Sequence, residues 1–189
     1  MKFKVFKFKK VKSTNNTALR IIKNSNYDYG MVLSDLQTNG KGQYGRKWVS
    51  YKGNLFVSFF YNLKHFNVSL NKLTKINCLL VKKLISKYYK KKIFFKKPND
   101  LIIEKKKICG ILQETVINAG KQFLIVGIGI NTNLDPKNSS FPATSLKHIT
   151  NKNIDNKKLF IMIKKNYEKL LFKANKNSFS ELKKFTRKI

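Results

Sequence analysis

The hydrophobic residues of this 189-residue chain change their spacing from one segment to the next, which predicts mixed α and β structure. Between residues 70 and 88 they recur every three or four positions, as in an amphipathic helix. The residues with this spacing are Leu70, Leu73, Ile76, Leu80, Val81, Leu84, Ile85 and Tyr88. The same spacing over residues 159–170 predicts a second long helix. Ser13-Thr14-Asn15 offers N-cap chemistry for a short helix near the N-terminus.

Segments rich in Phe, Val, Ile and Tyr predict β-strands between these helices. The expected strands cover residues 2–9, 31–36, 54–63, 93–96, 101–104, 107–116 and 123–131. Tight turns are expected at 105–106 and 118–120, and a capping box at 178–181 predicts a last helix. Most strands follow one another in hairpin-like succession. We therefore expect an α+β fold, with a mixed and mostly antiparallel β-sheet packed with helices.

Length and composition indicate one packed domain over residues 1–189, because 42% of the residues are hydrophobic and no linker or repeat divides the chain. No apolar run approaches the roughly 18 residues of a membrane span. The N-terminal MKFKVFKFKK lacks the apolar core of a signal peptide. Cys78 and Cys109 have no metal-site spacing, so a reducing cytoplasm is the simplest setting.

The net charge of +32 raises the question of nucleic-acid binding. Lysine is spread over the whole chain, however, and only Arg20, Arg46 and Arg187 carry the guanidinium fork that reads guanine. This pattern, with abundant Asn and Ile, is typical of the amino-acid drift of an AT-rich genome. A basic nucleic-acid-binding module is kept as an alternative. A basic surface would also steer an acidic protein partner towards the chain.

The stretch TNGKGQYGRKW, residues 38–48, contains a literal G-x-G-x-x-G. A dinucleotide-binding fingerprint requires a helix after the glycines, whereas the residues after Gly45 are strand-like. The lysine, catalytic-loop and metal-binding motifs that accompany a kinase glycine-rich loop are missing from the sequence. The glycines allow positive φ and an anion-binding nest, beside Lys41, Arg46 and Lys47. The alternative is a glycine-rich hairpin loop with ordinary surface lysines.

Three further blocks carry candidate chemistry. KKPNDL places Asn99 and Asp100 in a turn after a strand. In KKKICGILQE a lysine, Lys107, enters an apolar strand, and strict alternation would put it on the same face as Cys109 and Ile111. GIGIN, residues 127–131, has two glycines inside a strand, which indicates that a ligand or another backbone passes close by.

Taken in order, STNNTA, QTNGKGQYGRKW, KKPNDL, KKKICGILQE, GIGIN and FPATSL resemble the catalytic domain of biotin–protein ligases. The resemblance covers residues 13 to about 146 and implies a class II synthetase-like fold. It implies that biotin and Mg-ATP form biotinyl-adenylate, from which a lysine of a biotin carboxyl carrier protein then takes the biotin. Lipoate (or octanoate) protein ligases and transferases share the superfamily and are the runner-up.

The resemblance implies a role for each matching position. The implied biotin-binding residues are Ser13, Thr14, Asn15, Gln37, Gly40, Lys41, Gln43, Lys107, Gly110 and Gly129. The implied ATP-binding residues are Gln43, Arg46, Trp48, Asn99, Lys107 and Asn131. Lys107 and Arg46 are the implied catalytic residues. Lys107 would bridge the biotin carboxylate and the α-phosphate, and Arg46 would contact phosphate. The metal ligands of the Mg²⁺ that accompanies ATP stay open.

The sequence also departs from the family pattern. Where the family's loop commonly reads G-R-G-R-x-G-R, this chain has Lys41 and Gln43, so we expect a weaker grip on the adenylate. Lys97 stands where a tryptophan usually precedes Pro-Asn-Asp. We expect no N-terminal helix-turn-helix and no C-terminal β-barrel domain in this chain. A homodimer is possible.

Overall fold

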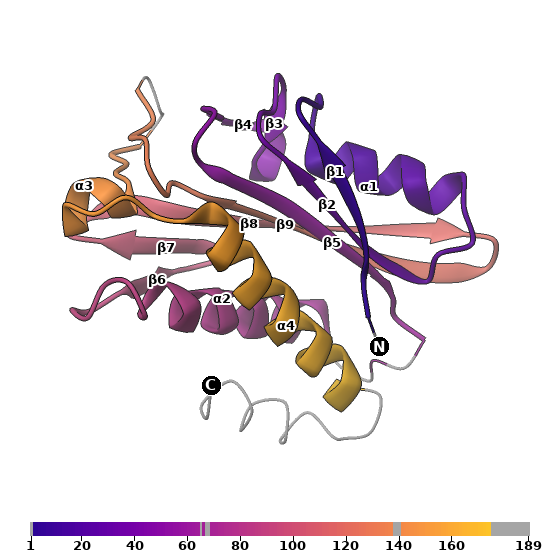
Figure 1. Ribbon diagram of the computed structural model, residues 1–189. Helices are drawn as coiled ribbons and strands as arrows, with labels where there is room; N and C mark the ends of the chain where they lie inside the picture. Colours follow the sequence, from indigo (N-terminus) through magenta and orange to yellow (C-terminus); the bar gives the residue numbers. More distant parts are fainter. Residues whose placement is uncertain (1, 65, 67–68, 138–140, 175–189) are drawn as a thin grey trace.

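The computed structural model describes residues 2–64, 66, 69–137 and 141–174 (Figure 1). A seven-stranded sheet with the order β1-β2-β5-β9-β8-β7-β6 forms its centre. The strands are β1 (Lys4–Phe8), β2 (Tyr29–Ser34), β5 (Leu55–Asn62), β6 (Phe94–Lys96), β7 (Asp100–Ile103), β8 (Lys106–Asn118) and β9 (Lys121–Ile130). β1 and β2 are parallel, and the other neighbours are antiparallel. This arrangement confirms the expected mixed, mostly antiparallel sheet.

Helices cover both faces of the sheet (Figure 1). Helix α1 (Thr14–Lys23) lies on one face, and α2 (Leu70–Ile85) and α4 (Asn156–Ala174) lie on the other. Ser13 caps α1 as predicted, because its Oγ accepts from the backbone N–H of Asn16 at 3.5 Å. The short helix α3 (Leu146–Thr150) precedes α4. None of the described helices is long and apolar enough to cross a membrane.

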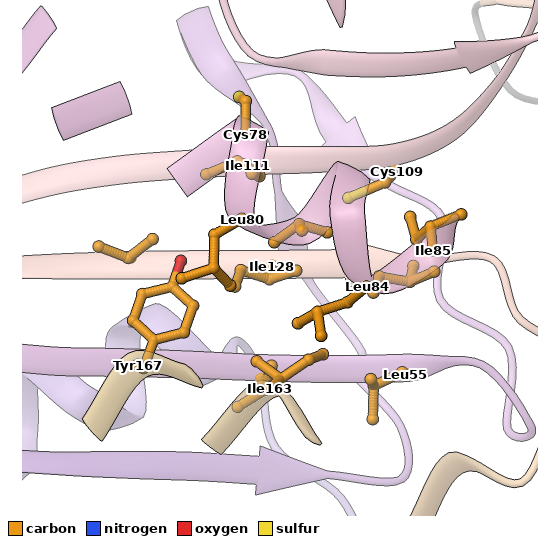
Figure 2. Packing of buried hydrophobic residues seen from close by; sticks show 14 of the residues in the cluster. Leu55, Cys78, Leu80, Leu84, Ile85, Cys109, Ile111, Ile128, Ile163 and Tyr167 are labelled. Atoms are coloured by element: carbon orange, nitrogen blue, oxygen red, sulfur yellow. The ribbon is translucent and has the colours of Figure 1, made fainter. Parts of the chain in front are cut away.

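The larger hydrophobic core lies between the sheet and the helices α2 and α4. Figure 2 shows Leu80 and Leu84 of α2 close to Ile128 of β9 and Ile163 of α4. All four side chains are almost completely buried. The ring of Tyr167 on α4 stacks on Phe59 of β5, with centroids 4.0 Å apart. This dry layer holds the sheet at a fixed distance from the two long helices.

The face of the sheet under α1 is packed differently. Ala18 and Ile22 of α1 meet Val32, Phe60 and Ile125 in a second, smaller apolar cluster. Towards the N-terminal end of α1 the cluster stops, and buried polar side chains and glycines take its place. The candidate site lies in this second part of the face.

The expected helices and strands are found with bounds shifted by a few residues. The turn expected at 105–106 is centred on Glu104 and Lys105, which both have positive φ (48° and 62°). A small ribbon of β3 (Gly40–Lys41) and β4 (Lys47–Trp48), the 3-10 turn η1 (Gln43–Gly45) and α3 were not predicted. These elements are too short to show a hydrophobic period. The helix predicted at 178–181 lies outside the described residues.

Candidate active site

Residues at the start of α1, on the β3–β4 ribbon and on β8 and β9 line a cavity of about 550 Å³. The predicted residues that line it are Ser13, Thr14, Asn15, Gln37, Lys41, Gln43, Arg46, Trp48, Asn99, Lys107, Gly110, Gly129 and Asn131. They come from segments far apart in the sequence, and the sheet brings them to one place. Gly40 is the predicted residue that does not line the cavity. A Cβ on Gly40 would lie 2.6 Å from the backbone oxygen of Trp48, so this glycine lets the ribbon close.

One end of the cavity is lined by neutral polar groups at the start of α1. The Gln37 Oε1 accepts from the backbone N–H of Thr14 at 2.8 Å and lies 3.0 Å from the Thr14 hydroxyl. The Gln37 Nε2 in turn donates to the Ser50 hydroxyl at 3.1 Å. These contacts hold the Gln37 amide in one orientation beside the N-terminus of α1. The polar end is therefore rigid and suited to a ligand with both donors and acceptors.

The wall of the cavity consists of glycines that sit side by side on β8 and β9. Gly110 pairs with Gly129, and a Cβ on either residue would overlap the indole of Trp48, at 2.6 Å and 2.4 Å respectively. A Cβ on Gly127 would lie 2.3 Å from Asn15 Oδ1. The glycines thus make room for two side chains of this protein. The sequence had indicated a ligand or a second backbone there; the nearest groups are the Trp48 and Asn15 side chains, and the three glycines also line the cavity.

Lys107 reaches the cavity because of a β-bulge. Leu101 of β7 pairs with Cys109, but the next residue, Ile102, pairs with Lys107, so Ile108 is an extra residue in β8. An extra residue reverses the alternation of side chains on either side of it. Ile108 and Cys109 are both fully buried in the core, whereas the Lys107 Cε lies next to Gly110. The expectation that Lys107 shares a face with Cys109 was therefore wrong.

The Lys107 ammonium group is held between a carboxylate and an aromatic ring. Its Nζ lies 2.8 Å from Asp100 Oδ1, and the two side chains are only 20% and 17% exposed. The same Nζ lies 5.2 Å from the centre of the Trp48 ring. Partial burial strengthens both attractions relative to a surface pair. These two contacts hold the lysine at the wall of the cavity.

The mouth of the cavity is strongly cationic. The lysine and arginine side chains that line it, in addition to Lys107, are Lys41, Arg46, Lys47, Lys96 and Lys97. Arg46 and Lys96 also lie 5.2 Å and 5.3 Å from the centre of the Phe141 ring. Asp100 is the acidic side chain that lines this cavity within the described part of the chain. The net positive field favours an anionic ligand.

The glycine loop differs in detail from the expected nest. Gly45 has a positive φ of 73°, and so does the non-glycine Tyr44, at 55°. Gly42 has a φ of −112°, and its N–H donates to the backbone oxygen of Arg46 at 2.6 Å. The loop continues into β4 and not into a helix, which excludes the dinucleotide fingerprint.

Two asparagines mark the far side of the cavity. The Asn99 Nδ2 donates to the backbone oxygen of Ile111 at 2.7 Å, so Asn99 anchors the turn before β7 to β8. The Asn131 Nδ2 lies 3.4 Å from the backbone oxygen of Lys107. Its Oδ1 is buried and has no hydrogen-bond partner among the described residues. Because buried polar atoms are normally satisfied, this oxygen is free to bind a ligand group.

A sequence model of the Biotin/lipoate A/B protein ligase family matches residues 6–131. The chain belongs to this family. The match spans the cavity-lining segments from Ser13 to Asn131.

Individual relatives agree with the family assignment. The "Bifunctional ligase/repressor BirA" of Bacillus subtilis is 32% identical over 154 residues, which are 76% of this chain and 46% of that protein. The chain therefore spans less than half the length of this relative. The structure of biotin protein ligase from Aquifex aeolicus in complex with biotin and ATP has a TM-score of 0.79 and 35% identity, covering 94% of this chain and 74% of that one. Biotin protein ligase from Leishmania major in complex with biotinyl-5-AMP has a TM-score of 0.73 and 26% identity, covering 85% and 71%.

Several residues in or next to this cavity were missed in the sequence. Ser58 interrupts an apolar strand and is fully buried, and Glu114 follows Gly110 at the even spacing that keeps residues on one face. Both signals were visible in the alternation of their strands. Phe141 gave no such signal, because it lies in an irregular segment. Asp100 had been noted only as a turn residue, and its ion pair with Lys107 depends on the bulge.

The two cysteines do not supply a nucleophile to the site. Both are buried free thiols on the core side of the sheet. Burial raises the pKa of Cys78 to about 12, and burial likewise raises the pKa of Cys109 well above its ordinary value. A thiol with so high a pKa is protonated at neutral pH and unreactive.

Proposed function

We propose that this chain attaches biotin to a lysine of a biotin carboxyl carrier protein through a biotinyl-adenylate. The observation that carries the proposal is one cavity with a neutral polar end, a cationic mouth and Lys107 between them. Biotin has the matching form, a cyclic urea joined by a short alkyl chain to a carboxylate. ATP brings the phosphates that a cationic mouth favours. The relatives that bind biotin and ATP support the same assignment.

The polar end suits the urea ring. A cyclic urea has two N–H donors and one carbonyl acceptor. Gln37 and Thr14 are hydrogen-bonded to each other, and Asn15 is linked to Thr14 through the Ser58 hydroxyl, so this end offers both acceptors and donors. We assign this end to the urea, and the adjoining wall, where Gly110 and Gly129 admit the Trp48 indole, to the rest of the ligand. The carboxylate then lies towards Lys107.

The first step joins two anions, so it needs cations more than a strong base. A biotin carboxylate oxygen forms a bond to the α-phosphorus of ATP, and the bond from that phosphorus to the bridging oxygen breaks. Pyrophosphate leaves with the electron pair. Lys107 would bind both the carboxylate and an α-phosphate oxygen, and Arg46 would neutralise charge on the phosphates. A fixed donor of this kind is typically worth about 100- to 1000-fold in rate.

Asp100 keeps Lys107 in place for this step. An ammonium group has three N–H donors, so Lys107 can keep its bond to Asp100 and direct the others to the two substrates. In the second step a carrier lysine, as the free amine, attacks the carbonyl carbon of the mixed anhydride. The carbon–oxygen bond to phosphate breaks, AMP leaves, and the attacking nitrogen loses its proton to solvent.

We propose that Mg²⁺ enters together with ATP. The described residues contain no group of three His, Cys, Asp or Glu side chains that could hold a metal by themselves. Mg²⁺ commonly takes phosphate oxygens, waters and one or two protein oxygens. The unpartnered Asn131 Oδ1 and the Asp100 carboxylate line the cavity and fit that limited role. The free, buried thiols of Cys78 and Cys109 support a reducing cytoplasm as the setting, and a homodimer stays a prediction.

The decisive experiment incubates the protein with biotin, Mg-ATP and an isolated carrier domain, and then detects biotin on the carrier with streptavidin. We expect labelled carrier, and none when ATP is omitted. A parallel reaction with lipoate, detected by mass, tests the runner-up, which the family description also includes. Labelling by lipoate alone would refute the assignment. Salt-sensitive retention on DNA or RNA at physiological ionic strength, without carrier labelling, would favour the nucleic-acid alternative.

A further inference from the structure

A line of hydrogen-bonded side chains runs from β8, across α1 and β5, to the polar end of the cavity. Its contacts are Glu114 Oε2 to Asn15 Nδ2 at 2.7 Å, Asn15 Oδ1 to Ser58 Oγ at 2.5 Å, Ser58 Oγ to Thr14 Oγ1 at 2.8 Å, and Thr14 Oγ1 to Gln37 Oε1 at 3.0 Å. We call this line the relay. Asn15, Thr14 and Gln37 line the cavity, whereas Ser58 and Glu114 do not.

Glu114 is an unusual choice of residue for this place. The chain has 41 Lys and Arg residues and only 9 Asp and Glu residues, so an acidic side chain easily finds a cationic partner. Within the described ranges, no lysine or arginine forms an ion pair with Glu114. Its carboxylate binds the neutral amide of Asn15 instead. Such a charge-assisted hydrogen bond is stronger than a neutral one.

The carboxylate fixes which way the Asn15 amide points. An ionised carboxylate only accepts hydrogen bonds, so the Asn15 NH₂ group must face Glu114 and its oxygen must face Ser58. The amide sits in the space left by the missing Cβ of Gly127, and it is 3% exposed. Packing and charge therefore hold a single orientation of this side chain.

The fixed amide determines the direction of the remaining hydrogen bonds, because each hydroxyl has one proton. Ser58 must give its proton to Asn15 Oδ1, so it has none to give to Thr14 Oγ1, 2.8 Å away. The Thr14 hydroxyl donates its own proton to Gln37 Oε1 at 3.0 Å, and Gln37 Oε1 also accepts from the backbone N–H of Thr14 at 2.8 Å. Thr14 Oγ1, which receives no proton from Ser58, is left as an acceptor at the polar end.

We propose that Glu114 is a positioning residue that sets the hydrogen-bond polarity of the biotin pocket. Through Asn15 and Ser58 it leaves Thr14 Oγ1 as an acceptor for a urea N–H. This inference rests on the proposed function, because it assumes that the ligand presents such a donor. Without the negative charge, the Asn15 amide can turn over, the hydroxyl protons can reverse, and the pocket loses its preference for an N–H.

The test compares biotin with derivatives methylated at either urea nitrogen, with the wild type and Glu114→Gln, by calorimetric titration. We expect Glu114→Gln to bind biotin about tenfold more weakly, in line with the loss of a charge-assisted hydrogen bond. We also expect the discrimination between biotin and the more weakly bound methylated derivative to shrink by a similar factor. Affinity for ATP should stay unchanged. A general loss of packing would weaken all ligands equally and would leave that discrimination intact.

Two further variants make the test specific. Glu104→Gln removes the same charge from a turn where Glu104 accepts from the Tyr89 hydroxyl, and it should leave the discrimination at the wild-type value. The exchange Asn15→Asp with Glu114→Gln should restore it. In that double variant the new amide donates to the new carboxylate, which still accepts from Ser58, so the polarity and the total charge are both retained.

The outcomes separate this proposal from the proposed function. A wild-type protein that binds no biotin refutes both. Biotin binding by the wild type, with undiminished discrimination in Glu114→Gln, refutes the relay alone. If Glu114→Gln does not fold, the exchange variant decides: restored binding and discrimination support the relay, and a folded exchange variant without discrimination overturns it.

Discussion

The two faces of the central sheet carry different kinds of residue, although they share the same strands. In β9, Val126 and Ile128 point into the dry core under α2 and α4, where they are almost fully buried. Gly127 and Gly129 alternate with them and face α1, where they accommodate Asn15 and Trp48. In β5, Ser58 likewise stands on the α1 face among apolar neighbours.

Within a single strand, the residues on the apolar face stabilise the fold, whereas the residues on the opposite face line or support the candidate site. A glycine inside a strand costs about 0.5–1 kcal/mol relative to alanine. The continuous apolar face on the other side of the same strands offsets that cost. The polar face can then hold hydrogen-bonding and charged groups in an orientation that suits a ligand. Variants on the two faces should therefore affect different measurements.

The largest expected effect is on stability, at the apolar face. Leu80→Ala removes a fully buried side chain from α2 and should lower the free energy of unfolding by about 2–5 kcal/mol. Urea unfolding measures this loss, and biotin affinity of the folded protein should stay unchanged. An affinity that fell in parallel with stability would mean that the two faces are not independent.

Lys107→Ala should have the opposite effect, with the reaction slowed and the stability little changed. We expect adenylate formation to slow by about 100- to 1000-fold while the protein still folds, because a fixed cation is lost from the reacting charges. Pyrophosphate release with biotin and Mg-ATP measures the rate. The matched control is Lys106→Ala, one residue earlier and exposed, which should keep the wild-type rate. A wild-type rate in Lys107→Ala would contradict the proposed catalytic role of Lys107.

Gly129→Ala tests the contact between the glycine wall and the indole. The added Cβ would lie 2.4 Å from Trp48, so the ring must move, and overpacking of this kind costs about 1–3 kcal/mol. We expect roughly a tenfold loss of ligand affinity. Trp48 is the only tryptophan, so a shift in emission reports its displacement directly. Val126→Ala, on the apolar face, should destabilise the protein and leave the emission unchanged.

The smallest expected effect is at the loop. Gln43→Arg adds a charge to the cavity lining and should slow the release of biotinyl-adenylate by a factor of about 2 to 5, as expected for an exposed ion pair. Filtration of the adenylate complex over time measures the release. Asn39→Arg adds the same charge outside the lining and serves as the control. Equal retention by wild type and Gln43→Arg would refute the idea that the loop grips the adenylate weakly.

Much of the architecture could be predicted because local periods are strong in this chain. Leu73, Leu80 and Leu84, which have the spacing of an amphipathic helix, are buried residues of α2. Ser13 is the N-cap of α1, as its position in the sequence predicts. The strand-like residues after Gly45 excluded the dinucleotide alternative, and they too are local information. Most candidate site residues were found from ordered motif blocks, and the cavity contains all of them except Gly40.

The sequence by itself determined the kinds of element, their order and the family resemblance, because these depend on neighbouring residues and on motif spacing. Only the tertiary structure decided where key side chains point. The bulge at Ile108 arises in pairing with β7, and it turns Lys107 from the core to the cavity. The relay joins Asn15 to Glu114, which are 99 residues apart. A contact of that kind leaves no period in the sequence, because it depends on how the sheet brings distant strands together.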